Sequence, residues 1–224
     1  MGCGQSTKQT TPIKNTTEKM TNTKETLSKI EAYVNKLLAD LNPDLRYHGR
    51  HHTIDIVYPA AMKLCDQENV TDEERLIVGA SALFHDTGFL DQYEKNEPMG
   101  AERAATQLKQ FGFTDDQIKI VKECIMATQL PQSPGDNKLA QIVCDADVSS
   151  IGSDDFFITS ETLRQELNLV KQLGIRPRKW HEGNTKFLQN HTYFTESAKK
   201  HLQPIKERNM KDTLELLGVD ELPQ

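Results

Sequence analysis

Three of the seven histidines of this 224-residue chain lie within five positions, in the stretch RYHGRHHTIDIV that runs from Arg46 to Val57. Because His48 and His52 are four residues apart, a helix would place both imidazoles on one face, whereas His51 would point elsewhere. An imidazole can bind a metal ion or carry a proton near neutral pH. This stretch is therefore the first candidate for chemistry.

Two further stretches supply carboxylates that can complete such a site. In ALFHDTGF, His85 and Asp86 follow an apolar run, and Gly88 is the kind of residue that ends a helix, so both side chains can reach one ion. In IVCDADVSSIG, Asp145 and Asp147 also follow an apolar segment. Imidazoles combined with carboxylates suit one divalent ion of Mn, Fe, Co, Zn or Mg better than a soft metal.

Helices are expected to position these residues. Apolar residues recur at helical spacing through most of the chain, whereas the alternating pattern of strands is nearly absent. Capping boxes at Thr71 with Glu74 and at Thr114 with Gln117 predict two helix starts. Further helices are expected over 99–110, 137–146, 155–173, 184–200 and 204–218.

The predicted fold class is all-α, with a single globular helical domain over residues 23–220. Residues 1–22 are rich in Thr, Lys, Asn and Ser and hold few large apolar groups, which predicts a disordered N-terminal tail. In the helical stretch that follows Gly49, Pro59 is expected to lie inside the helix and to kink it.

Taken in order, HHT at His52, HD at His85–Asp86 and the later DAD resemble the signature of the HD-domain metal-dependent phosphohydrolases. The likeness covers about residues 41–152, and KFLQNHTYFTESAKK extends it over most of residues 30–218. The resemblance implies an HD-domain helical bundle, in agreement with the periodicity. It also implies four metal ligands, with the second Asp of DAD as the last: His52, His85, Asp86 and Asp147. Asp145 would support them.

The resemblance also implies a proton donor. The spacing from Tyr47 and His48 to His52 is similar to that in cyclic-nucleotide phosphodiesterases, in which the earlier histidine protonates the leaving oxygen. His48 is thus the candidate general acid, and Asp86 is the second residue assigned to catalysis. Those enzymes usually carry Asn after that histidine, and Gly49 in this chain weakens the assignment.

The number of metal ions is expected to be one. Two-metal branches of the family place additional histidines between the positions of Asp86 and Asp147, and this chain has none there. A second ion could bind only more weakly, through carboxylates such as Asp91 or Glu97.

Substrate contacts are predicted outside the ligand set. Arg50 is a cation that could hold a phosphate. Gln129 belongs to ATQLPQSP, residues 127–134, which resembles a site-lining loop of related proteins, with an ordinary Pro-rich connection as the alternative. His191 is the one later histidine expected to touch a substrate. Trp180 is expected to anchor the core rather than to stack on a base.

These expectations predict a metal-dependent phosphoric ester hydrolase. Its partner would be a small phosphorylated substrate such as a nucleotide, with a phosphodiester favoured by the spacing of His48 and His52. The metal would activate water and polarise a phosphoryl oxygen. The alternative is a non-catalytic HD regulatory module that binds metal and nucleotide and is anchored to a membrane, and turnover distinguishes the two.

Composition limits the surroundings in which the protein works. The net charge of −6 argues against a nucleic-acid surface. No secretory signal is visible, and scattered cysteines predict free thiols, so a cytoplasmic location is expected. Gly2 and Ser6 fit the N-myristoylation pattern and Cys3 could accept a palmitoyl chain, which would bring membrane contact through an acylated N-terminus. A chance match is the alternative.

Overall fold

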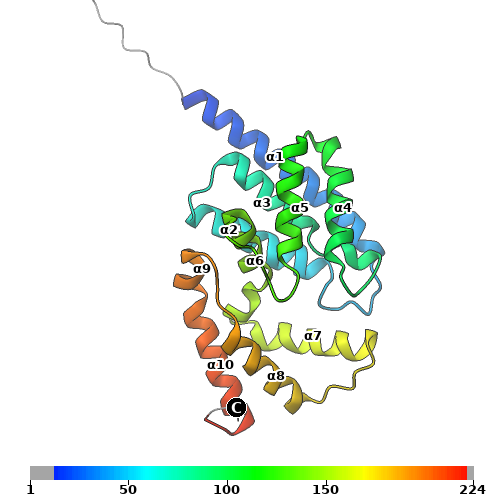
Figure 1. The fold of residues 1–224 in the computed structure, drawn as a ribbon, viewed down its shortest axis with the longest axis vertical. Helices are drawn as coiled ribbons and strands as arrows, with labels where there is room; N and C mark the ends of the chain where they lie inside the picture. The colour runs from blue at the N-terminus through cyan, green and yellow to red at the C-terminus, as the bar shows by residue number, and fades with distance from the viewer. Residues whose placement is uncertain (1–12, 221–224) are drawn as a thin grey trace, which may run out of the picture.

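The computed structural model describes the backbone of residues 13–220 and the side chains of residues 22–220. Every regular element within these residues is a helix (Figure 1), which confirms the predicted all-α fold. The α-helices are α1 (Ile13–Leu37), α2 (Tyr58–Gln67), α3 (Asp72–Phe84), α4 (Glu97–Leu108), α5 (Asp115–Ala127), α6 (Lys138–Asp147), α7 (Phe156–Val170), α8 (Pro177–Asn190), α9 (Glu196–His201) and α10 (Gln203–Leu217). The short elements are the 3₁₀-helices η1 (Leu38–Asp40), η3 (Thr87–Leu90), η4 (Lys109–Phe111) and η5 (Ser149–Gly152), and the π-helix η2 (His51–Val57).

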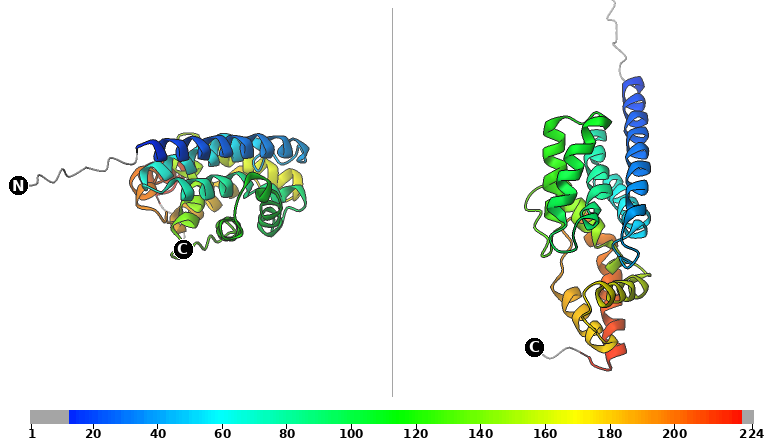
Figure 2. Two further views of the ribbon diagram at one scale, coloured as in Figure 1. Left: turned by 90° about the horizontal axis from the view of Figure 1, so that it is seen from above. Right: turned by 90° about the vertical axis from the view of Figure 1, so that its right-hand side faces the viewer.

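The core is built around α3. Its residues 77–84 are all buried, as expected of a helix that has neighbours on every side. It packs against α1, α2, α5 and α6. In Figures 1 and 2, α1 and α3–α5 gather at one end of the long axis and α7, α8 and α10 lie at the other. The central helix therefore ends inside the molecule, which places His85 and Asp86 where the two groups meet.

Both predicted capping boxes are present. The Thr71 side chain accepts a hydrogen bond from the Glu74 N–H while Glu74 accepts one from the Thr71 backbone, so α3 starts there. Thr114 and Gln117 make the same reciprocal pair at the start of α5. These caps satisfy N–H groups that the first turn of a helix leaves unpaired.

Pro59 lies inside a continuous helical run, but in the first turn of α2, directly after the π-helix η2. The Tyr58 N–H donates to the Thr53 carbonyl, five residues back, which is the wider spacing of a π-turn. Because proline has no N–H and is tolerated in a first turn, the wide turn accommodates it. His52 belongs to this wide turn.

The expected helix over residues 184–200 is wrong, because the chain breaks between α8 and α9. Asp145, buried on α6, accepts hydrogen bonds from the backbone N–H groups of Phe194 and Thr195 and from the Thr195 hydroxyl. Thr195 in turn caps α9 by accepting from the Ala198 N–H. A buried carboxylate that takes three donors outweighs the helical periodicity of this segment.

Helix α1 begins at Ile13, within the predicted tail of residues 1–22, and its first described buried side chain is Thr23. Gly2, Cys3 and Ser6 lie outside the described residues. The three cysteines that the structure describes, Cys65, Cys124 and Cys144, are buried free thiols. Among the described helices, none combines the length and the apolar character that crossing a membrane requires.

Candidate metal centre

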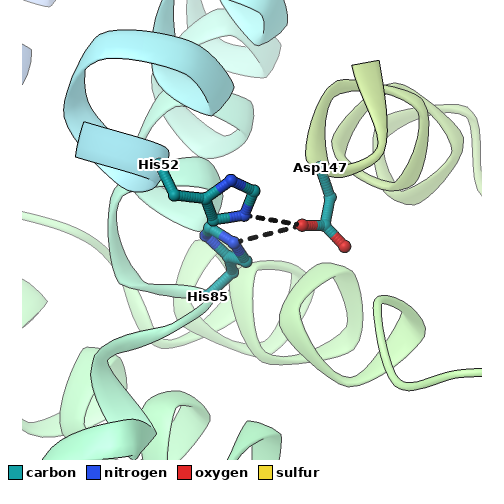
Figure 3. A group of neighbouring side chains, drawn as sticks. All are labelled: His52, His85 and Asp147. Atoms are coloured by element: carbon teal, nitrogen blue, oxygen red, sulfur yellow. Dashed lines mark hydrogen bonds and ion pairs between the residues drawn. The ribbon is translucent and has the colours of Figure 1, made fainter. Parts of the chain in front are cut away.

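Three of the four predicted ligands converge from different elements. His52 comes from η2, His85 follows the end of α3, and Asp147 is the last residue of α6 (Figure 3). Asp147 Oδ1 lies 3.2 Å from His52 Nε2 and 3.3 Å from His85 Nε2. One ligand atom from each residue falls within 4.8 Å of the others, which is close enough for all three to hold one metal ion.

The fourth predicted ligand, Asp86, lies beside the same cluster. Its Oδ2 is 3.2 Å from His85 Nε2 and 3.5 Å from His52 Nε2. Both His85 Nε2 and Asp86 Oδ2 are buried and have no hydrogen-bond partner. Buried polar atoms are normally satisfied, so unpaired nitrogen and oxygen lone pairs aimed at one point fit a bound cation. The donor set of imidazoles and carboxylates fits a divalent ion.

The tautomer of His85 also fits metal binding. Its Nδ1 lies 2.8 Å from the Ala82 carbonyl oxygen. Since a carbonyl only accepts, Nδ1 carries a proton and donates, so Nε2 is the ring nitrogen that faces the cluster and is left to bind a metal ion. The hydrogen bond to Ala82, in the last turn of α3, thus fixes the orientation of the His85 imidazole.

Two glycines allow the backbone of α4 to pack closely against the backbone around His85 and Asp86. A Cβ on Gly88 would lie 1.8 Å from the Asn96 carbonyl oxygen, and one on Gly100 would lie 2.9 Å from that of His85. No side chain fits at Gly88 without moving backbone. The expectation that Gly88 ends the helix is wrong, because α3 already ends at Phe84 and Gly88 lies within η3, where the close backbone approach requires a glycine. The backbone around His85 and Asp86 is held between α3 and α4.

Charges in the cluster shift the ionisation of its members. Burial opposes the negative charge of Asp147, but the hydrogen bond to His52 and the imidazole of His85 facing it outweigh burial and hold the pKa of Asp147 well below its usual range. Burial likewise opposes a positive charge on His85, yet Asp86 and Asp147 together raise its pKa well above the ordinary value. The two carboxylates thus favour positive charge at this place, which a bound cation would also supply.

Asp145, the other carboxylate of DAD, does not face the cluster. Both of its oxygens are used in fixing the start of α9, as described above. Two aspartates separated by one residue on a helix point in directions about 200° apart. The choice of Asp147 over Asp145 as the predicted ligand therefore agrees with the geometry, and Asp145 supports the fold rather than the metal ligands.

His48 lies next to the cluster and is held by a carboxylate that the sequence analysis missed. Glu166, fully buried on α7, approaches His48 Nδ1 at 2.5 Å. The same carboxylate accepts hydrogen bonds from the backbone N–H groups of Tyr47 and His48 and from the Tyr93 hydroxyl. The His48 ring stacks on Phe89, with ring centres 4.3 Å apart. Carboxylate and stacking together fix the imidazole in one orientation.

The carboxylate also changes the proton affinity of His48. Burial disfavours the charged imidazole, but the hydrogen bond that His48 donates to Glu166 and the nearby charge of Asp86 outweigh burial and raise the pKa of His48. Burial and His48 act on the pKa of Glu166 in opposite directions, and the net result is a lowered pKa. Glu166 therefore favours the protonated form of His48, and an imidazolium can donate a proton.

A cavity of about 140 Å³ opens beside His48 and Asp147. The cavity is also lined by Tyr47, by Leu130 in the loop after α5, by residues that follow the end of α6, and by side chains of α7 and α8. The cavity brings the candidate acid and one candidate metal ligand to a common space, so a ligand in it could touch both. Trp180, expected in the core, is partly exposed and lines this cavity.

The three predicted substrate residues lie elsewhere. Arg50 is exposed and pairs with Asn35 and Asp55 on the surface. Gln129 is half-buried and does not line the cavity, although the next residue of its loop, Leu130, does. His191 packs between the rings of Phe187 and Tyr193, and neither of its ring nitrogens has a partner.

The carboxylates considered for a second metal ion differ in their surroundings. Asp91 pairs with Arg103 at the surface. Glu97 keeps one buried oxygen without a partner, and burial, together with the charges of Asp86 and Asp147, raises its pKa. Of these two carboxylates, Glu97 is therefore the one whose pKa is affected by the charges of the cluster.

Gln132 contacts the cluster and was also missed. Its amide nitrogen donates to Asp147 Oδ2 at 3.3 Å and to the Cys144 carbonyl at 3.0 Å. It belongs to the 127–134 loop that was expected to line the site. The sequence therefore indicated the correct loop, but the backbone conformation of the loop determines that Gln132, and not Gln129, points toward the cluster.

Comparisons of the chain with protein-family models, with curated proteins and with solved structures found no match. The resemblance to HD-domain phosphohydrolases therefore stays a prediction from the residues, and the fold and the His/Asp cluster stand on the structure alone.

Proposed function

We propose that this protein is a metal-dependent phosphohydrolase that cleaves a small phosphate ester, with phosphodiesters favoured. The observation that carries the proposal is the group of His52, His85 and Asp147, in which His85 Nε2 has no hydrogen-bond partner, beside a cavity that His48 also lines. A mixed imidazole and carboxylate site next to a positioned acid suits hydrolysis of phosphate esters.

The residues divide the chemistry between them. His52, His85, Asp86 and Asp147 would hold one divalent ion. That ion would supply an activated water and a Lewis acid for the phosphoryl oxygen. Gln132, through its bond to Asp147 Oδ2, keeps that carboxylate turned toward the histidines.

His48 would donate a proton to the leaving oxygen. Its Nδ1 is engaged with Glu166, so the ring nitrogen left to act on a substrate is Nε2. General acid catalysis of this kind contributes roughly 10²- to 10⁴-fold in rate, most for leaving groups that depart poorly as anions. Glu166 acts through His48 and is a positioning residue.

The first experiment is hydrolysis of a panel of phosphate mono- and diesters, including cyclic nucleotides and deoxynucleoside triphosphates, with added Mn²⁺. The purified protein should turn over at least one ester, and the His85→Ala/Asp86→Ala variant should lose that turnover. A protein that binds metal and hydrolyses none of them would instead be the non-catalytic module.

A second experiment tests His48. The His48→Asn variant should slow hydrolysis of benzyl phosphate, which has a poor leaving group, much more than that of 4-nitrophenyl phosphate. An equal loss on both esters would contradict a proton-donating role, because the nitrophenolate needs no proton to leave.

A further inference from the structure

The walls of the cavity beside the cluster come from two helices that face each other. Trp180, Asn184, Phe187 and Leu188 recur at the spacing of one face of α8. Phe156, Thr159, Ser160 and Leu163 do the same on α7. The remaining sides are closed by Tyr47, His48, Leu130, Asp147, Val148, Ser150 and Ile151.

The lining is aromatic and apolar, which indicates what it can hold. Four rings contribute to it, those of Tyr47, Phe156, Trp180 and Phe187. Leu130 and Phe187 remain 64% and 37% exposed, so they stand at the mouth. The volume of about 140 Å³ compares with a cavity of about 150 Å³ that admits benzene in another protein, so there is room for one ring.

The charges on the lining are confined to the end near the cluster. Among the described residues that line the cavity, Asp147 and His48 are the ionisable groups that also belong to the candidate metal centre or adjoin it. None of the described lining residues is a Lys or an Arg. An anionic group buried among the rings would have no cation to pair with, and burying an unpaired charge is strongly unfavourable. The phosphate of a ligand would thus have to lie at the cluster.

One polar group interrupts the apolar wall. Ser160 Oγ accepts hydrogen bonds from Trp180 Nε1 at 2.8 Å and from the Asn184 amide at 2.5 Å. These bonds fix the indole and the amide against α7. The described part of the chain offers Ser160 no acceptor for its own proton, so the hydroxyl can donate to a neutral polar atom of a ligand.

We infer that this cavity, defined here as the ring pocket, binds the uncharged, single-ring aromatic or heteroaromatic group of a phosphate ester whose phosphate lies at the His52, His85 and Asp147 cluster. This inference rests on the proposed function, because that function places the phosphate. It narrows the substrate class to esters with one ring and no second anionic group.

The test measures binding rather than turnover. Trp180 is the only tryptophan of the chain, so its fluorescence reports on the ring pocket directly. The full-length protein, with its metal and added Mg²⁺, is titrated with phenylphosphonate, methylphosphonate and 4-carboxyphenylphosphonate, which are not hydrolysed. Their phosphonate group is shared, and they differ only in the ring and in its charge.

We expect phenylphosphonate to change the emission saturably and to bind roughly 10- to 100-fold more tightly than methylphosphonate, from the apolar area of one ring. The carboxylated probe should bind at least about tenfold more weakly than phenylphosphonate, because its second charge has no partner. Phe187→Ala and Leu130→Ala, both at the mouth, should weaken phenylphosphonate and leave methylphosphonate unchanged. Ile158→Ala is the control, since Ile158 is 70% exposed on α7 and does not line the pocket.

The failure of this inference differs from that of the proposed function. Equal affinities for the three probes, or no effect of Phe187→Ala and Leu130→Ala, in a protein that hydrolyses esters would overturn the ring pocket alone. Tight, ring-dependent binding in a protein that hydrolyses no ester would support the ring pocket and overturn the hydrolase. No change in Trp180 emission with any probe would also overturn the ring pocket.

Discussion

Replacing Glu166 by glutamine should destabilise the protein, because this one carboxylate holds the segment before the π-helix. It accepts from the Tyr47 and His48 N–H groups at 2.7 and 3.0 Å, from the Tyr93 hydroxyl at 2.9 Å and from His48 Nδ1. An amide oxygen can keep the two backbone donors. The amide NH₂ would then face His48 and Tyr93, and it cannot accept from either.

The main loss is the charge-assisted bond to His48. Hydrogen bonds to charged groups contribute about 1.5–3 kcal/mol, and the smaller cost of burying an amide offsets part of this. We therefore expect Glu166→Gln to lower the free energy of unfolding by about 2 kcal/mol at pH 6. For a domain of this size that corresponds to a fall of roughly 4–8 °C in Tm.

The sign of the pH dependence follows from the two pKa shifts. The pKa of His48 is raised and that of Glu166 is lowered, each against the opposing effect of burial, so the pair is fully charged between them. Its stabilisation is present at pH 6 and is lost as the pH rises through the raised pKa of His48. The difference between wild type and Glu166→Gln should therefore shrink at pH 9.

Glu25→Gln is the control, since Glu25 lies on α1 and pairs with Lys29 where both side chains are exposed. An exposed pair contributes at most about 1 kcal/mol, so this variant should unfold nearly as the wild type does. Chemical denaturation followed by circular dichroism at both pH values makes the comparison. A Glu166→Gln variant as stable as Glu25→Gln at pH 6 would refute the reasoning.

Three further predictions concern the cluster and its surroundings. His52→Ala should lose the metal measured by elemental analysis, whereas His51→Ala should keep it, because the His51 side chain is 73% exposed and contacts only the surface carboxylate beside it. Gly88→Ala should destabilise the fold by about 3 kcal/mol in chemical denaturation, since its Cβ would lie 1.8 Å from the Asn96 carbonyl oxygen; unchanged stability would contradict the close approach. Burial, with Lys206 nearby, lowers the pKa of His191 to about 4, below its unfolded value, so the unfolded chain binds the extra proton and stability should fall by up to about 2 kcal/mol between pH 6.5 and 4. His191→Phe should reduce that fall, and an identical pH profile would exclude His191 as its source.

The His/Asp cluster could be predicted from sequence because its members lie beside local signals. His85 and Asp86 follow an apolar helix and Asp147 ends another, and the resemblance to HD-domain proteins then selected Asp147 over Asp145. The capping boxes at Thr71 and Thr114 located the helices for the same reason. Local sequence patterns were enough to predict those helix starts and ends that depend on neighbouring residues alone.

Glu166 could not be predicted in the same way. It lies 118 residues from His48 in the chain, and a glutamate within an amphipathic helix looks like a solvent-exposed residue. Only the packing of α7 against residues 47–48 buries it. The break before α9 has a similar origin, since the carboxylate of Asp145 on a distant helix decides it. Long-range hydrogen bonds to buried carboxylates leave no periodic trace in the sequence.

The π-helix at His51–Val57 makes the candidate metal centre sensitive to chain length. A π-turn is one residue wider than an α-turn, so deleting one residue within it, such as the exposed Asp55, would restore regular α-helical spacing. Residues before the deletion would then rotate by about 100° relative to α2. His52 would swing out of the cluster, while Ala61 and Leu64 on α2 would keep their places in the core. A deletion of a residue that is itself no ligand, and not only a substitution of a ligand such as His52→Ala, is thus a genetic change that could turn this fold into a metal-free relative in one step.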